Sequence, residues 1–159
     1  MEASLDVSGL PEVSFAQGDV VLEQGQTGSK VYILKSGSVA VLAGGNEICK
    51  FGEAGTVLGE ISALLGGEIS ATVKAETEAT FEVIDNLDTY CADHPGAGFY
   101  LARVLAQRVV NMNVLFADIR SEIKGMEAEG KGTSKLWSFI ERIDQFWATE
   151  VFAVRPLDK

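Results

Sequence analysis

The sequence predicts a mainly β domain, a barrel or roll, followed by a long helix and one further amphipathic helix. Residues 10–85 carry short β-branched and apolar runs, with turn signals every several residues. From residue 97 the apolar spacing becomes helical. We therefore divide the chain into a domain over 10–128, a polar, glycine-rich linker over 125–134, and a C-terminal helix with its tail over 135–159.

The β part is predicted from alternation and turn residues. Val31 and Ile33, followed by Val39 and Val41, alternate as the strands of a half-buried hairpin would. Gly44-Gly45-Asn46 is typical of a tight turn between two strands. The expected strands are 13–15, 20–22, 30–35, 38–42, 47–51, 71–75 and 80–84.

Two helices are expected after the strands. Residues 87–92 predict a short helix that stops near Pro95, and a long helix follows over 97–128. Apolar residues in the long helix repeat at alternating intervals of four and three, which is a heptad pattern. This pattern predicts a homodimer through the helix at 99–128. The seam residues are Leu105, Val109, Met112, Phe116, Ile119, Ile123 and Met126.

The segment GEISALLGGEISATVKA, residues 59–75, indicates a ligand site. A Gly-Glu pair opens a short apolar helix over 61–65, and Gly66-Gly67 closes it. The first N–H groups of a helix have no partner within the helix and can hold an anion, while small residues behind it allow a ligand close to the backbone. Taken alone, the segment favours a pocket for a small ligand with a phosphate or carboxylate.

This segment resembles the phosphate-binding cassette of the cyclic nucleotide-binding domain family. Gly59-Glu60 matches the opening pair of the family pattern, and Ser70-Ala71-Thr72-Val73 matches its end. The slot for the family's arginine holds Ile69, preceded by Glu68. The similarity extends from about residue 10 to about 125, and it implies a double-stranded β-helix, or jelly roll, that binds cyclic AMP or cyclic GMP.

The resemblance also implies roles for individual residues. Glu60 would accept a hydrogen bond from the ribose, while backbone N–H groups of residues 62–64 and the hydroxyl of Ser70 would hold the phosphate. By residue type, Asn111, Asn113 and Thr133 are candidates for contacts with the base. The predicted ligand-binding residues are Gly59, Glu60, Ile61, Ser62, Ile69, Ser70 and Ala71.

Replacing the arginine by isoleucine removes a charged donor that pairs with phosphate in a forked geometry. The loss of such a contact costs roughly two to three decades of affinity. Three alternatives follow: a cyclic nucleotide binds weakly, a less charged ligand binds, or the pocket is empty and the fold is kept for protein contacts. The function expected is therefore a stand-alone regulatory or sensor module in signal transduction, with a degenerate protein-interaction module as the alternative.

Composition limits the partners. A net charge of −10 and a pI near 4.5 argue against nucleic acid and anionic membranes. A DNA-binding domain is not expected, because the chain after the long helix is too short for one and lacks a basic face. The sequence has no 18-residue apolar run, so no membrane-spanning helix is expected, and its N-terminus does not have the pattern of a signal peptide. Cys49 and Cys91 lack the spacing of a metal site or a redox pair. These features predict a cytoplasmic location.

The C-terminal helix carries a large apolar face over 136–147, which includes Trp137 and Trp147. We expect this face to pack on the roll or on the dimer partner, with docking of another protein as the alternative. An enzyme is not expected, because His94 is the only histidine and no catalytic triad spacing appears. No metal or resident cofactor is predicted, and haem held by Cys49, Cys91 or His94 is the weak alternative.

Overall fold

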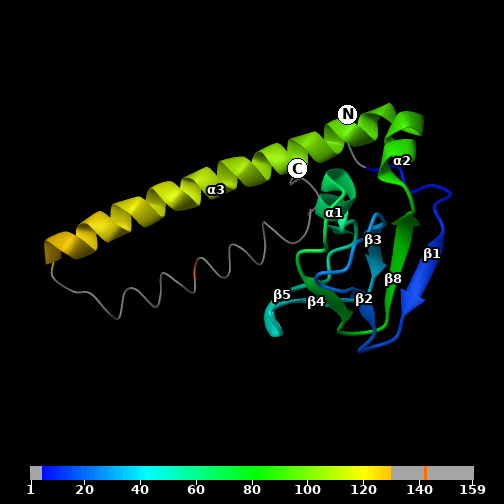
Figure 1. Ribbon diagram of the computed structural model, residues 1–159, viewed down its shortest axis with the longest axis horizontal. Helices are drawn as coiled ribbons and strands as arrows, with labels where there is room; N and C mark the ends of the chain where they lie inside the picture. The colour runs from blue at the N-terminus through cyan, green and yellow to red at the C-terminus, as the bar shows by residue number, and fades with distance from the viewer. Residues whose placement is uncertain (1–4, 130–141, 143–159) are drawn as a thin grey trace.

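The computed structural model describes residues 5–129 and Arg142. Two four-stranded antiparallel sheets form a β-roll, from which a long helix extends (Figure 1). One sheet has the strand order β1-β8-β3-β6, and the other has β2-β7-β4-β5. The strands are β1 (Glu12–Phe15), β2 (Val20–Leu22), β3 (Val31–Ser36), β4 (Val39–Ala43), β5 (Asn46–Phe51), β6 (Val57–Leu58), β7 (Thr72–Ala75) and β8 (Ala79–Ile84).

A hydrophobic core fills the interior of the roll, because the strands place alternate apolar side chains on their inner faces. Leu34, Val39 and Val41 are almost completely buried in it. The rings of Phe15, Tyr32 and Phe81 meet edge to face, with centroids 5.8–6.2 Å apart. Burial of these β-branched and aromatic side chains is the main stabilising term for the roll.

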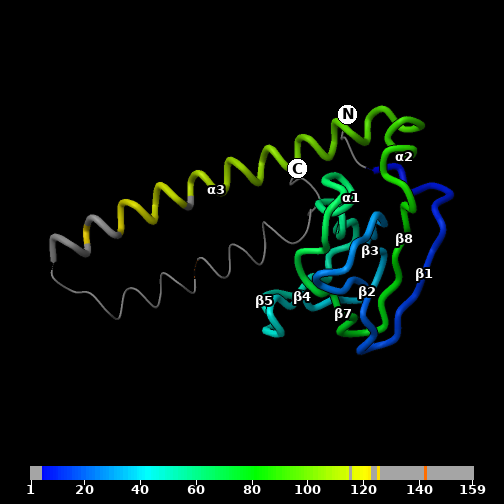
Figure 2. Tube along the Cα trace, in the orientation of Figure 1, coloured from blue at the N-terminus to red at the C-terminus, as the bar shows by residue number. Residues whose placement is uncertain are grey.

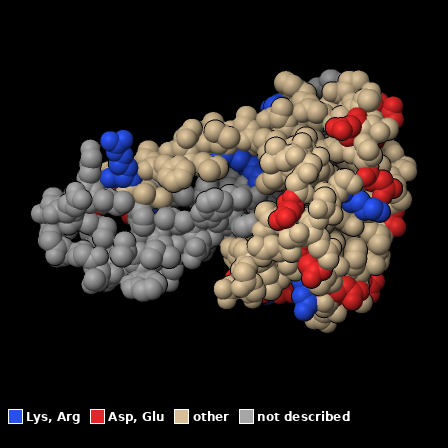
Figure 3. All heavy atoms as spheres, in the orientation of Figure 1, with Lys and Arg blue, Asp and Glu red and all other residues tan. Residues whose placement is uncertain are grey.

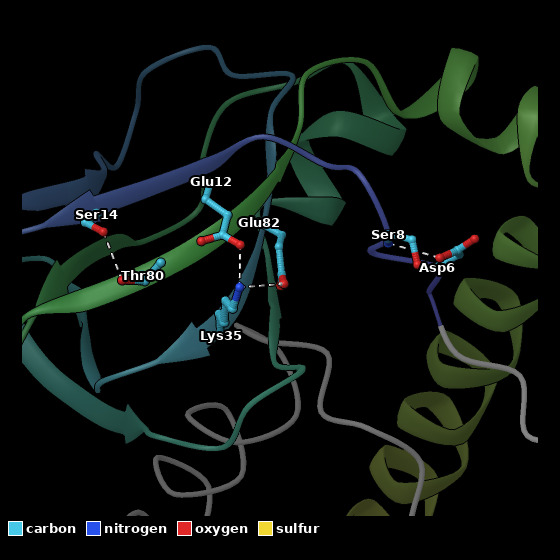
Figure 4. Close-up of polar contacts among 7 residues, drawn as sticks. All are labelled: Asp6, Ser8, Glu12, Ser14, Lys35, Thr80 and Glu82. Carbon is cyan, nitrogen blue, oxygen red and sulfur yellow. Dashed lines mark hydrogen bonds and ion pairs between the residues drawn. The ribbon is translucent and has the colours of Figure 1, made fainter.

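Polar contacts on the outer face of the first sheet link β1, β8 and β3 (Figure 4). Lys35 on β3 pairs with Glu12 on β1 and lies 3.9 Å from a carboxylate oxygen of Glu82 on β8. The hydroxyls of Ser14 and Thr80 lie 2.9 Å apart. Exposed ion pairs of this kind contribute little to stability, so they mark the register of the strands rather than hold the sheet together.

The prediction that the third and fourth strands pair as a hairpin is wrong. β3 pairs with β8 and β6, whereas β4 pairs with β7 and β5, so the two strands lie in different sheets. Gly37 makes the transition with a φ of +86°, and a Cβ at this position would lie 2.2 Å from the carbonyl oxygen of Glu78. The close approach of this backbone directs β4 away from β3, and a local turn signal cannot reveal that.

Three helices complete the described part of the chain: α1 (Glu60–Leu65), α2 (Leu87–Asp93) and α3 (Pro95–Glu129). Asn86 caps α2 through its side chain, which accepts from the N–H of Thr89. A second hydrophobic cluster joins α2 and the start of α3 to the roll, and it includes Val31, Ile84, Tyr90 and Leu101. α3 then projects well past the roll (Figure 2).

Most of the predicted elements are confirmed, with boundaries shifted by one or two residues. The two-residue strand β6 is too short for a pattern to indicate. α3 starts at Pro95 and includes residues 125–129 of the predicted linker. The predicted C-terminal helix lies outside the described residues, apart from Arg142.

The predicted seam of α3 divides into two sets. Leu105, Met112 and Ile119 are half-buried, whereas Val109 and Phe116 are 56% and 57% exposed. Phe99, Val110 and Val114 are exposed as well. The described part of α3 therefore carries uncovered apolar side chains on more than one side. None of the described helices is long and apolar enough to cross a membrane.

Candidate functional site

Two glycines set the ends of the short helix α1. Gly59 precedes the helix with φ +85°, and Gly66 follows it with φ +64°, both in the left-handed region that favours glycine. A Cβ on Gly59 would lie 2.7 Å from the carbonyl oxygen of Lys30, whereas one on Gly66 would meet no atom within 4 Å. Gly59 is therefore needed for close packing against the chain before β3, and Gly66 for its backbone conformation alone.

Glu60 is buried at the start of α1, with 1% of its surface exposed. Nη1 of Arg108 on α3 donates to its Oε1 at 2.8 Å, and Arg108 is itself 8% exposed. Burial raises the pKa of Glu60, and Arg108 together with the backbone N–H groups of Glu60 and Ile61 offsets part of that rise. A buried ion pair thus connects the cassette to the long helix.

Several donors and acceptors at the start of α1 are already engaged within the chain. The Glu60 carboxylate accepts from the backbone N–H groups of Glu60 and Ile61, directly before the N–H groups of residues 62–64 that the sequence assigned to a ligand. The hydroxyl of Ser62 donates to the carbonyl oxygen of Gly59 at 3.0 Å, and the N–H of Ala63 donates to the same oxygen. The helix start is already supplied with a negative group from its own chain.

The side chain of Ile69 belongs to the core of the roll. It is 8% exposed, in the same cluster as Val41 and Val73. Its N–H donates to the carbonyl oxygen of Gln26 at 2.8 Å, and its carbonyl oxygen accepts from the N–H of Gly25 at 2.9 Å. These bonds and the bridge between Thr27 and Glu68 attach the loop before β7 to the turn after β2.

The structure brings all the predicted ligand-binding residues together around one hollow. Its volume is about 20 Å³, which is room for a single water molecule and far below the several hundred Å³ of a small-molecule pocket. The hollow around the predicted ligand-binding residues is therefore narrow in this structure. The hollow is lined by Gly59, Glu60, Ile61, Ser62, Ile69, Ser70 and Ala71, together with Leu22, Val41 and Val73.

Arg108 is the site residue that the sequence analysis missed. Ala97, Leu101 and Val104 are buried against the roll, and Arg108 continues the same helical side at the next interval of four. An arginine in line with apolar residues that face a core is the signal that could have identified it, since such a charge needs a buried partner. Asn111 and Asn113, the candidates by type, lie further along α3, and Thr133 lies outside the described residues.

The residues considered for catalysis or haem binding are His94, Cys49 and Cys91, and each lies packed within the fold. His94 ends α2, stacks on Tyr90 at 4.3 Å and places Nδ1 3.0 Å from the carbonyl oxygen of Tyr90. Cys49 and Cys91 are half-buried. Among the described residues no cluster of His, Cys, Asp and Glu could hold a metal ion. On the face shown in Figure 3, acidic and basic side chains are interspersed over the roll.

A larger cavity, of about 360 Å³, is lined by different residues, among them Leu5, Val7, Ile33 and Tyr100. Its polar lining includes Lys35 and Glu82, which already face each other. It shares no residue with the cassette hollow, so it does not provide the space that a ligand at Glu60 would need.

Comparison with known proteins agrees with this geometry. The family model "Cyclic nucleotide-binding domain" matches residues 12–89. Residues 12–89 are thus similar to this family. The match covers the roll, the cassette and the start of α2, while α3 lies after the matched residues.

This chain spans only part of the length of the proteins that it resembles. The mouse potassium/sodium hyperpolarization-activated cyclic nucleotide-gated channel 2 is 32% identical over 83 residues, which is 51% of this chain and 10% of the channel. A cAMP-dependent protein kinase regulatory subunit from Debaryomyces hansenii is 26% identical over 74% of this chain and 24% of that protein. The catabolite activator protein of Thermus thermophilus superposes with a TM-score of 0.61 at 26% identity, over 76% of this chain and 57% of that one.

Proposed function

We propose that this chain is a regulatory module that uses the cyclic nucleotide-binding fold for protein contacts, with a cassette that does not hold a cyclic nucleotide at micromolar concentration. The observation that carries the proposal is the position of Ile69. Its side chain completes the core beside a hollow of about 20 Å³. A nucleotide could enter only after this side chain left the core, which costs a few kcal/mol.

Electrostatics support the same proposal. The described residues that line the hollow include neither lysine nor arginine, and they include the Glu60 carboxylate. Arg108, which lies behind the hollow on α3, pairs with Glu60. A cyclic phosphate would meet a carboxylate and partly occupied N–H groups, without a guanidinium to compensate for its desolvation.

A weak cyclic nucleotide sensor is the second candidate. It is favoured by the Gly59-Glu60 pair and by the gathering of all the predicted ligand residues around one hollow. In this case the ribose hydroxyl would compete with Arg108 for the Glu60 carboxylate. Binding would then be felt in α3, and the millimolar range is expected because the arginine of the family pattern is absent.

Replacing Ile69 by arginine separates the two candidates. We expect calorimetry to detect no binding of cyclic AMP or cyclic GMP to the unaltered chain at 1 mM ligand, on the order of the concentration that a lost phosphate contact implies. Ile69→Arg restores the fork and should improve nucleotide affinity at least about tenfold into the measurable range. Ile69→Met, which keeps an apolar side chain of similar size, is the matched control and should not bind.

Each result has a clear meaning. Saturable binding of either nucleotide to the unaltered chain, with a dissociation constant of roughly 1 mM or below, would contradict the first candidate and favour the sensor. Failure of Ile69→Arg to bind, with thermal unfolding showing an intact fold, would mean that the rest of the cassette excludes nucleotide as well.

We also propose that the side of α3 that carries Val109 and Phe116 is a homodimer interface. Both side chains are more than half exposed, and at 100° per residue they lie on the same side of the helix. Large apolar side chains at helical spacing are what a helix pair buries. The sequence alternative, a protein partner at 136–147, lies outside the described residues apart from Arg142 and stays a prediction, as does the cytoplasmic location.

Substituting Phe116 by glutamate is expected to abolish this dimer. Sedimentation at tens of micromolar should give a dimer for the unaltered chain and a monomer for Phe116→Glu, because a charge in an apolar seam leaves an unpaired buried group. Gln107→Glu adds the same charge on a different side of α3 and should leave the dimer intact. A monomeric unaltered chain at this concentration would contradict the interface.

A further inference from the structure

The cavity of about 360 Å³ lies between the outer face of the first sheet and the start of α3. On β3, Leu34 belongs to the core inside the roll, whereas Ile33 belongs to the cluster that joins the sheet to the helices. The apolar wall of the cavity comes from three parts of the chain and includes Ile33, Tyr100 on α3, and Leu5 and Val7 before β1. A volume of several hundred Å³ with such walls is typical of a site for a small molecule.

Hydrogen bonds fix the N-terminal wall of this cavity. The hydroxyl of Tyr90 on α2 donates to the carbonyl oxygen of Asp6 at 2.6 Å. The N–H of Ser8 donates to Oδ1 of Asp6 at 3.0 Å, as Figure 4 shows. The N–H of Leu10 donates to the carbonyl oxygen of Val7 at 3.2 Å. The folded chain therefore forms the cavity by itself, and a ligand does not have to organise its wall.

Tyr100 brings a polar group to this cavity. Its side chain is 4% exposed, and its hydroxyl has no hydrogen-bond partner among the residues that the structure describes. No polar side-chain atom in the described part of the chain is both sealed from solvent and unpaired. The accessible part of the hydroxyl therefore faces the cavity that Tyr100 lines. Burial raises the pKa of Tyr100, so the hydroxyl stays protonated at neutral pH and can donate to a ligand.

The charges beside the cavity favour a cation. Glu82 on β8 lies directly opposite Glu12 on β1, and Lys35 contacts both (Figure 4). Lys35 pairs closely with Glu12 but is 3.9 Å from Oε1 of Glu82, which is too long for a hydrogen bond. Two carboxylates thus share one ammonium, and the side chain of Glu82 is only 13% exposed. A second cation at Glu82 would be attracted, whereas an anion would be repelled.

We propose that this cavity binds a small, mainly apolar molecule that carries a primary ammonium and a hydroxyl group. The ammonium pairs with the carboxylate of Glu82, and the hydroxyl of the ligand accepts from the hydroxyl of Tyr100. The apolar body lies against Leu5, Val7 and Ile33. The site shares no residue with the cassette hollow, so it gives the roll a second ligand position on the outside of the other sheet.

Calorimetry on the full chain tests the chemical class of the ligand. The probes are tyramine, which is rigid, and aminohexanol, which is flexible and adapts to the spacing between the two polar groups. At least one of them should saturate a single site with a dissociation constant of about 2 mM or below. Para-hydroxyphenylpropionate, with a carboxylate in place of the ammonium, should bind at least about tenfold more weakly. No binding of either amine, or equal affinity for the propionate, would overturn the proposal.

Replacing Glu82 by glutamine tests the place of the ammonium. Glu82→Gln should weaken binding of the better amine at least about tenfold, because a charge-assisted hydrogen bond is lost. Glu47→Gln is the matched control, since Glu47 is exposed on β5 of the other sheet, and it should leave the affinity unchanged. Equal affinities for the two variants would mean that the amine responds only to the overall negative charge, and the proposal would fall.

Replacing Tyr100 by phenylalanine tests the place of the hydroxyl. Tyr100→Phe should weaken the better amine roughly threefold to tenfold. It should not weaken the analogue without a hydroxyl, phenethylamine or hexylamine. Tyr32→Phe is the control, because the ring of Tyr32 packs on Phe15 and Phe81 and does not line the cavity. The same loss for both kinds of ligand, or none for either, would contradict the contact with Tyr100.

A larger side chain at position 7 tests the cavity itself. Val7→Trp places an indole in the space that the ligand needs and should abolish binding of both amines, while thermal unfolding reports whether the fold is kept. Val7→Phe is the milder variant if the tryptophan destabilises the chain. Unchanged affinity in a folded Val7 variant would place the amine elsewhere and overturn the proposal.

Discussion

Replacing Arg108 by methionine is expected to destabilise the protein by about 3 kcal/mol at pH 7. Methionine keeps much of the side-chain packing but leaves the carboxylate of Glu60, 1% exposed, without its guanidinium. A buried charge without a partner costs more than the intact pair contributes, because its desolvation is no longer compensated. Double replacement with Glu60→Gln should recover a large part of the loss.

The loss should depend on pH in a definite direction. Burial raises the pKa of Glu60 above its ordinary value of 4.5, so the folded state binds this proton more tightly than the unfolded state. Glu60 therefore contributes stability that is fully present below about pH 4.5 and is lost as the pH rises through its folded pKa. In Arg108→Met the rise in pKa is larger, so the deficit should be greatest at pH 7 and shrink toward pH 4.5.

Urea unfolding at both pH values measures this effect, with Arg103→Met as the matched control. Arg103 lies on the same helix and is exposed, so its replacement should cost little at either pH. Equal losses for the two variants, or a deficit in Arg108→Met that does not change with pH, would show that the ion pair does not connect α1 to α3 as described.

Replacing Gly59 by alanine should cost about 2–4 kcal/mol, and the same change at Gly66 only about 1 kcal/mol. Both glycines have positive φ, so both variants bear the strain of a left-handed alanine. Only at Gly59 does the new Cβ also meet backbone, 2.7 Å from the carbonyl oxygen of Lys30. The difference between the two thermal or urea midpoints isolates the steric contribution. Similar midpoints would mean that the chain before β3 yields easily and that Gly59 is needed for conformation alone.

Local patterns predicted the elements of this fold well because each depends on neighbours in the sequence. The alternation in β4 and the turn at Gly44-Gly45 are such signals, and Gly44 and Gly45 do adopt positive φ. The pairing partner of β3 depends instead on Gly37 meeting Glu78, about forty residues away, and the hairpin prediction failed there.

The sequence pattern indicated which residues lie together at the candidate site, but not how much space they leave. The glycine and small-residue pattern singled out residues 59–62 and 69–71, which the structure places around one hollow. The small size of the hollow depends on packing between distant segments, in which Ile69 joins Val41 and Val73. The partner of Glu60 is Arg108 on α3, which is not one of the heptad positions predicted for that helix.

The paired hydrogen bonds between Ile69 and the turn at Gly25 and Gln26 have a mechanical consequence. A molecule that displaces the backbone at Ile69 would strain or break this two-bond link. Movement of the loop before β7 and rearrangement of the turn after β2 would then be one cooperative event, felt at the surface of the roll at residues 23–28.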